Sequence, residues 1–243
     1  MNRKSYLLFV LSFMSFTMIH TGFLSAQILD GRLGLFEQNA DVGNVKIAGS
    51  AYYNVEKQEY TLQGSGKNIW FGSDEFQYLY KRIKGDFILT AQVKFVGAGV
   101  DPHRKIGWMI RQSQDSASPQ VSALLHGDGL TSLQYREKSG ADMKENQLLI
   151  GSPDVIQLSR KGKIYTMSAA HWGDTFISEE ISGDFLSDEV YVGLFICSHN
   201  PEVTEKALFN NVRIEIPAAE NLVPYRDYLG SNLETMDMET GAR

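Results

Sequence analysis

Apolar and polar residues alternate with a period of two along most of this chain, which is the pattern of half-buried β-strands. In residues 87–95 every odd position is apolar, from Phe87 to Phe95, and the even positions are mostly polar. Residues 191–197 are apolar on both faces and predict a central strand that is covered on both sides. Residues 208–216 alternate again, and we expect Leu208, Val212, Ile214 and Ile216 to share one face. Residues 27–216 contain no convincing amphipathic helix.

Turn signals separate the apolar runs at short intervals and predict β-hairpins. The expected hairpins join residues 51–54 to 59–62, residues 122–126 to 131–137, and residues 155–160 to 163–171. Roughly ten to twelve strands follow from this spacing. The pattern therefore predicts an all-β fold, in which two antiparallel sheets pack face to face and bury their apolar faces.

The ends of the chain differ from this body. Residues 1–26 combine Arg3 and Lys4, an apolar stretch and small residues at Ser25-Ala26, which is the layout of a secretory signal peptide cleaved near Ala26. An uncleaved membrane anchor is the alternative, but the apolar stretch is short for a span, which needs about 20 apolar residues. We expect residues 27–216 to form the sandwich, residues 217–243 to be a linker and tail, and the protein to be periplasmic or extracellular, with no membrane span after cleavage.

Charge and cysteine content exclude several classes of partner and site. The 243 residues carry a formal net charge of −6, and the pI is about 5.4, so nucleic acid is not an expected partner. Cys197 is the single cysteine, which excludes an internal disulfide framework and predicts a small buried apolar residue.

An ordered set of short segments resembles a jelly-roll module of the concanavalin A-like lectin/glucanase superfamily, in a subfamily of uncharacterised bacterial secreted proteins. The segments are residues 60–66 (YTLQGSG), 68–70 (NIW), 76–80 (FQYLY), 85–87 (GDF), 105–111 (KIGWMIR), 192–194 (VGL), 198–200 (SHN) and 207–212 (ALFNNV). The resemblance implies a two-sheet jelly roll over about residues 45–216. It also implies one concave sheet, which in this superfamily is the face that binds sugars.

Residues 221–231 (NLVPYRDYLGS) and 233–237 (LETMD) resemble the connector and first strand of a TolB-type β-propeller. In proteins of that kind the jelly roll precedes the propeller. The chain ends at Arg243, so we expect either a shortened form of such a protein or another pairing for this tail.

Catalytic and metal motifs find little support in the sequence. A retaining glucanase needs two carboxylates about 5–5.5 Å apart, which on one strand requires acids that share a face. The sandwich has no Glu-x-Asp-x-Glu strand, and Glu234, Asp237 and Glu239 lie in the tail and do not all share a face. There is also no Gly-x-Ser-x-Gly elbow and no pair of histidines with zinc-ligand spacing. We therefore predict no catalysis and no cofactor, and keep glycoside hydrolysis as a weaker alternative.

Calcium stays an open alternative, because the superfamily includes calcium sites on loop carboxylates. Here Asp101, Asp115 or Asp128 would supply the ligands. The sequence has no loop as rich in Asp as such a site requires.

The best candidate site is one face of a sheet on which aromatic rings stack against sugars and polar side chains bind hydroxyls. Trp70, Trp108, Tyr135 and Trp172 supply rings, and the expected ligand-binding residues are Trp70, Arg111, Gln134, Arg136, His199 and Asn200. Trp108 and Arg111 point to opposite faces of a regular strand, so Trp108 belongs to the core if Arg111 lines the site. Structural roles are the alternatives: His199 and Asn200 would complete a turn before Pro201, and a buried Arg111 would pair with Glu75 or Asp86.

Two functions remain open. The first is an exported module that binds carbohydrate or another envelope polymer without catalysis. The second is a structural domain that docks against a propeller or an envelope protein and binds no small ligand.

Overall fold

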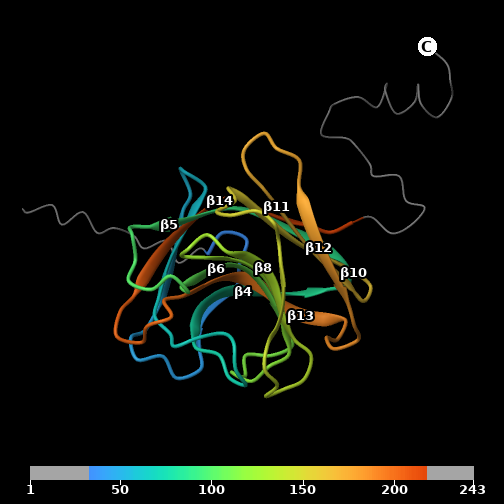
Figure 1. The fold of residues 1–243 in the computed structure, drawn as a ribbon, viewed down its shortest axis with the longest axis horizontal. Helices are drawn as coiled ribbons and strands as arrows, with labels where there is room; N and C mark the ends of the chain where they lie inside the picture. The colour runs from blue at the N-terminus through green and yellow to red at the C-terminus, as the bar shows by residue number, and fades with distance from the viewer. Residues whose placement is uncertain (1–32, 218–243) are drawn as a thin grey trace, which may run out of the picture. The chain divides into compact units, whose positions relative to one another are not determined.

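The computed structural model describes residues 33–217, which form fourteen β-strands and, within that range, no helix. The strands make two antiparallel sheets of seven strands each, which Figure 1 shows as two facing layers. This confirms the predicted all-β, two-sheet antiparallel sandwich, with somewhat more strands than the turn spacing indicated. The expected signal peptide at residues 1–26 and nearly all of the expected tail, residues 218–243, lie outside the described residues.

Sheet A carries the candidate site. Its strands, in spatial order, are β1 (Gln38–Val42), β4 (Phe76–Lys84), β13 (Glu189–Cys197), β6 (Lys105–Arg111), β7 (Gln120–His126), β8 (Thr131–Arg136) and β9 (Lys144–Gln147). Strand β13 lies between β4 and β6, and its residues are buried from Val192 to Cys197. The predicted central strand, covered on both faces, is therefore confirmed.

Sheet B covers the inner face of sheet A. Its strands, in spatial order, are β12 (Ile177–Ser182), β11 (Ile164–Ala170), β10 (Val155–Lys161), β5 (Phe87–Val96), β14 (Glu205–Glu215), β3 (Glu59–Gly64) and β2 (Ser50–Asn54). The pairs β2–β3, β7–β8 and β10–β11 are antiparallel neighbours, which confirms the three predicted hairpins.

Two apolar clusters follow from the alternation of side chains. The larger cluster lies between the sheets and includes Trp108, Phe87 and Leu194. The smaller cluster lies on the outer face of sheet A, where Tyr78, Met109, Leu124 and Phe195 occupy the opposite strand positions. Sheet A is therefore buried on both faces over much of its area, and only part of its outer face is left to form a site.

One prediction about side-chain direction was wrong. In β14, Ala207 and Phe209 are fully buried in the core, so Leu208 points the other way. The pairing with β5 shifts register between Asn210 and Arg213. A β-bulge of this kind turns the rest of the strand over, so that Val212 and Ile214 pack on the core although Leu208 does not.

Gly107 in β6 occupies a position that other residues would not tolerate. Its φ of +153° is rare for residues with a side chain, and a Cβ placed there would lie 2.1 Å from the carbonyl oxygen of Ala123 on β7. The glycine thus lets β6 and β7 approach closely beside Lys105, which lies two positions earlier on the same face.

In the part of the chain that the structure describes, no helix is long and apolar enough to cross a membrane.

Candidate functional site

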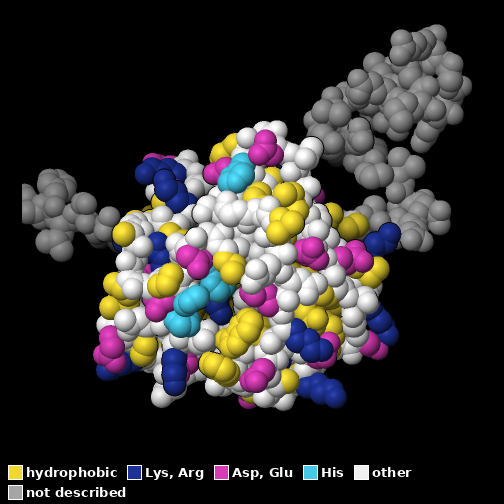
Figure 2. Space-filling model, viewed as in Figure 1, with side chains coloured by type: hydrophobic (Ala, Val, Ile, Leu, Met, Phe, Trp, Pro, Cys, Tyr) yellow, Lys and Arg dark blue, Asp and Glu magenta, His cyan; other side chains and the backbone are white. Residues whose placement is uncertain are grey.

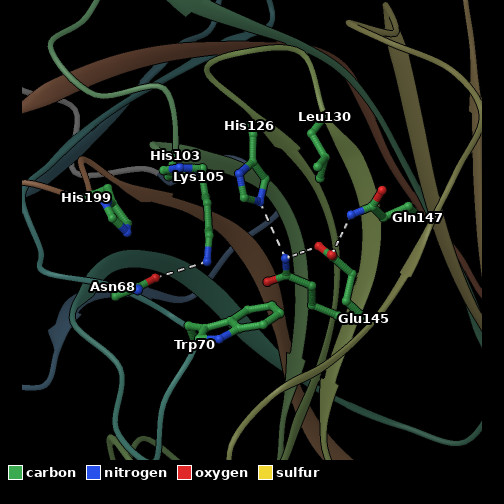
Figure 3. Close-up of a pocket in the computed structure, with 10 residues that line it drawn as sticks. Asn68, Trp70, His103, Lys105, His126, Leu130, Glu145, Gln147 and His199 are labelled. Carbon is green, nitrogen blue, oxygen red and sulfur yellow. Dashed lines mark hydrogen bonds between the residues drawn. The ribbon is translucent and has the colours of Figure 1, made fainter.

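The outer face of sheet A holds a cavity of about 360 Å³ next to the smaller apolar cluster. Figure 2 shows histidine side chains gathered beside a hollow on the face turned to the viewer, and Figure 3 shows the side chains that line the cavity. Its lining comes from β6 to β9 and from four loops, and consists of Asn68, Trp70, His103, Lys105, His126, Leu130, Gln134, Glu145, Gln147 and His199.

Strand register brings the polar lining together. Lys105 pairs with His126 across β6 and β7, and Gln134 pairs with Glu145 across β8 and β9. Paired residues point to the same face of a sheet, so residues far apart in the sequence form one polar floor.

The loop between β3 and β4 forms one wall of this cavity, and three of its successive carbonyl groups are bound to sheet A or to the loop before β9. The carbonyl of Ile69 accepts a hydrogen bond of 2.9 Å from Lys105 Nζ, and that of Trp70 accepts one of 2.8 Å from the backbone NH of Met143. The carbonyl of Phe71 accepts from Arg136 Nη2. The backbone that carries the Trp70 ring is therefore fixed in place.

A buried ion cluster anchors the same loop. Arg111 Nη1 donates to Asp74 Oδ2 at 2.6 Å, and Arg136 donates to both carboxylate oxygens of Asp74, at 2.6 and 2.8 Å. All three side chains are fully buried. Arg111 also donates to the carbonyls of Ser113 and Asp115, so these two arginines use their charge and fork-shaped donor sets to hold loops against the sheet.

Lys105 places an almost fully buried ammonium group in the cavity. Its Nζ donates to Asn68 Oδ1 at 3.1 Å and to the carbonyl of Ile69, and both acceptors are uncharged. It also lies 5.6 Å from the centre of the Trp70 ring, a distance at which cation and ring attract each other. Burial lowers the pKa of Lys105 to about 8, so the side chain is mostly protonated at neutral pH.

His126 and Gln134 each carry one buried polar atom that has no hydrogen-bond partner among the described residues. The amide nitrogen of Gln134 donates to Glu145 Oε1 at 2.7 Å and lies 3.4 Å from His126 Nε2. The same nitrogen lies 3.3 Å from Ser132 Oγ, so its second hydrogen serves either Ser132 or His126. In the latter arrangement His126 Nε2 accepts and the ring proton lies on Nδ1, because an amide NH₂ only donates. The two buried atoms without a partner are Gln134 Oε1 and His126 Nδ1.

The ionisation of the lining residues follows from burial and from their partners. Burial, and then the nearby charge of Lys105, lower the pKa of His126 to about 4, so its ring is neutral at neutral pH. Burial acts to raise the pKa of Glu145, but hydrogen bonds from its neighbours, Gln147 and Gln134 among them, outweigh it and lower the pKa. The cavity therefore combines the Lys105 ammonium, the Glu145 carboxylate and the neutral ring of His126.

His199 stands at the boundary of the cavity, in a turn with φ of +57°. Its Nδ1 lies 3.2 Å from Asp101 Oδ1, and its ring centre lies 5.4 Å from that of His103. Asn200 is not among the lining residues; its Oδ1 accepts from the backbone NH of Glu202 at 2.9 Å, which is the turn role considered as an alternative above.

The structure brings together three of the six side chains expected to bind a ligand, namely Trp70, Gln134 and His199. Arg111 and Arg136 lie on the same face of sheet A but are buried with Asp74 and do not line the cavity. The expected alternative partners, Glu75 or Asp86, are wrong, because the carboxylate that meets Arg111 is that of Asp74. Trp108 is a core residue, as expected for a strand on which Arg111 takes the outer face.

The sequence interpretation missed Asn68, His103, Lys105, His126, Glu145 and Gln147. The alternation in β6 could have indicated Lys105, because Lys105 lies on the same face of that strand as Arg111, which was an expected site residue. No signal in the sequence gave the pairing of β8 with β9, which brings Glu145 beside Gln134.

The carboxylates considered for calcium lie in turns. Asp101, Asp115 and Asp128 each accept a hydrogen bond from a backbone NH two residues further along. Within residues 33–217, no three His, Cys, Asp or Glu side chains are grouped so that they could hold a metal ion.

No family model and no curated protein matches this chain. A functionally unknown protein from Saccharomyces cerevisiae has a similar solved structure, with a TM-score of 0.56, 14% identity and coverage of 75% of this chain and 98% of that chain. The carbohydrate-binding module CBM66 from Bacillus subtilis has a TM-score of 0.45 at 14% identity, covering 75% and 98%. A family 7 alginate lyase, A1-II′, has a TM-score of 0.48 at 10% identity, covering 76% and 94%. At these identities the similarity concerns the fold alone, and residues 33–217 are a jelly-roll β-sandwich.

Proposed function

We propose that the sandwich binds a carbohydrate chain, without catalysis, in the cavity on the outer face of sheet A. The observation that carries this proposal is the pair of buried polar atoms without partners, Gln134 Oε1 and His126 Nδ1, in a cavity that is also lined by the Trp70 ring. A buried polar group without a partner costs about 1–3 kcal/mol. A sugar hydroxyl donates and accepts, so adjacent hydroxyls satisfy both atoms while the apolar face of the sugar ring packs on Trp70.

The size and polarity of the cavity support the same proposal. A volume of about 360 Å³ lies at the lower end of the range found for small-molecule sites, about 300–1,000 Å³. Most of its lining side chains are amides, imidazoles or charged groups, which suit a ligand with many hydroxyls better than an apolar ligand.

The absence of catalysis is part of the proposal. Among the described residues that line the cavity, Glu145 supplies the one carboxylate, whereas hydrolysis of a glycosidic bond by the usual route uses two. Glu145 is also held by Gln134 and Gln147 through its two oxygens.

Affinity electrophoresis of the purified chain through gels that contain laminarin, alginate, xylan or hydroxyethylcellulose tests this function. We expect retardation by at least one polysaccharide, loss of that retardation in Gln134→Leu, and no release of reducing ends or unsaturated products. A chain that runs freely in all four gels would contradict the binding function, and sustained release of product would contradict the absence of catalysis.

We also propose that the protein is exported, on the basis of the signal-like pattern of residues 1–26. N-terminal sequencing of the protein from the cell envelope or the medium tests this. A mature chain that begins near Gln27 is expected, and an unprocessed chain in the cytosol would contradict it.

A further inference from the structure

A second cavity of about 390 Å³ lies beside the first. It is lined by Lys67, Asn68, Phe71, Ser73, Glu75 and His199. Asn68 and His199 line both cavities, so these two side chains form the boundary between them. The two cavities are thus neighbours on the surface of the sandwich.

Two successive residues of the loop between β3 and β4 each place an aromatic side chain in one of the cavities. Trp70 lines the first cavity and Phe71 the second. The Phe71 side chain is 62% exposed, which is unusual for a phenylalanine on a well-anchored backbone. Its exposure is not the result of a loose loop, because its carbonyl is bound by the buried Arg136.

Gly72, the residue after Phe71, keeps this loop close to the loop between β8 and β9. A Cβ at Gly72 would lie 2.6 Å from the carbonyl oxygen of Gly140, so the backbones of the two loops are in contact there. With the backbone anchored in this way, only the side-chain torsions of Phe71 are ordered when a ligand packs on its ring, which lowers the entropic cost of binding.

Polar groups surround Phe71 as they surround Trp70. The side chains of Lys67 and Ser73 are exposed beside it, and Glu75 Oε2 accepts a hydrogen bond of 3.2 Å from the backbone NH of Lys67. The second cavity therefore also combines one ring with donors and acceptors, and its volume suits a small ligand unit.

We infer that the two cavities are successive subsites for one glycan chain, with Trp70 as the ring of the first subsite and Phe71 as the ring of the second. The preferred ligand is then an oligosaccharide of at least two units that crosses the boundary formed by Asn68 and His199. This inference rests on the proposed carbohydrate-binding function and specifies the ligand class.

Isothermal titration calorimetry of the full chain with cello-, laminari-, xylo- and alginate oligosaccharides of one to six units tests it. The variants are Phe71→Ala and, as a matched control, Phe176→Ala, which removes a ring that is 49% exposed and lines neither cavity. In the wild-type chain, affinity for the bound series is expected to rise with length. Phe71→Ala is expected to weaken binding of the longest oligomers about tenfold, which corresponds to about 1.4 kcal/mol, and to leave the shortest bound oligomer unaffected. Phe176→Ala is expected to match the wild type.

If Phe71→Ala binds each oligomer as tightly as the wild type does, the second subsite is overturned and the proposed function stands. A loss in Phe71→Ala that is as large for the shortest oligomer as for the longest would also overturn it, because Phe71 would then belong to the first subsite. If the wild-type chain binds no member of the four series, the proposed function and the second subsite both fail.

Discussion

Arg136 and Asp74 form a bidentate ion pair on the outer face of sheet A, with N–O distances of 2.6 and 2.8 Å. Both side chains are fully buried. Arg111 binds the same carboxylate from β6. The cluster joins the loop that carries Trp70 and Phe71 to β6 and β8, so the shape of the candidate site depends on charges that do not themselves line the cavity.

Removal of the shared carboxylate is expected to destabilise the fold. Asp74→Asn leaves two buried guanidinium groups without a counter-charge, and breaking a buried pair in this way costs about 3–5 kcal/mol. Equilibrium urea unfolding measures the change in the free energy of unfolding.

A matched control is Asp184→Asn, which removes an exposed carboxylate that lies 2.6 Å from Lys163 Nζ. Exposed pairs contribute about 0–1 kcal/mol, so this variant is expected to unfold nearly as the wild type does. Losses of similar size in the two variants would show that the Asp74 cluster has no special structural role.

The stability of the protein is expected to depend on His126 in mildly acidic solution. Its pKa is lowered from 6.5 to about 4 in the folded chain by burial and by Lys105. Between those pH values the unfolded chain binds a proton that the folded chain does not, so stability falls as the pH falls, by at most about 1.36 kcal/mol per pH unit.

Urea unfolding of the wild type and of His126→Asn at several pH values in this window checks the expectation. The free-energy difference between the two proteins should change with pH in favour of the variant as the solution becomes more acidic. Parallel curves would mean that His126 titrates alike in the folded and unfolded chains.

Cys197 is expected to be unreactive in the folded protein. Burial raises the pKa of its thiol to about 11, and the side chain is free but fully buried at the end of β13. Mass spectrometry should find no iodoacetamide adduct at pH 8 in buffer and one adduct in urea. Rapid labelling of the folded chain would contradict the burial of this strand end.

Much of the fold could be predicted from the sequence because alternation and turn residues report directly on strands. The hairpins and the doubly buried β13 were found in this way. The direction of Leu208 could not be found, because a bulge near Asn211, whose φ is +48°, shifts the alternation without a glycine or proline to indicate it.

The candidate site was harder to predict because it depends on which strands are neighbours. Trp70, Gln134 and His199 were recognised by residue type, but Lys105 and Glu145 join them only through the strand order of sheet A. Arg111 and Arg136 have the residue type of ligand-binding groups, and only the position of Asp74 shows that both are engaged with a buried carboxylate.

Carbohydrate binding at the Trp70 cavity is tested most directly by the affinity of two tryptophan variants for whichever polysaccharide retards the wild-type chain. Trp70→Ala removes the ring of the cavity, whereas Trp172→Ala removes a ring that is 64% exposed and lies outside it. We predict at least about a tenfold loss of affinity for Trp70→Ala, equivalent to about 1.4 kcal/mol, and an unchanged affinity for Trp172→Ala. Unchanged binding by Trp70→Ala, with the loss found instead in Trp172→Ala, would contradict the placement of the ligand on sheet A.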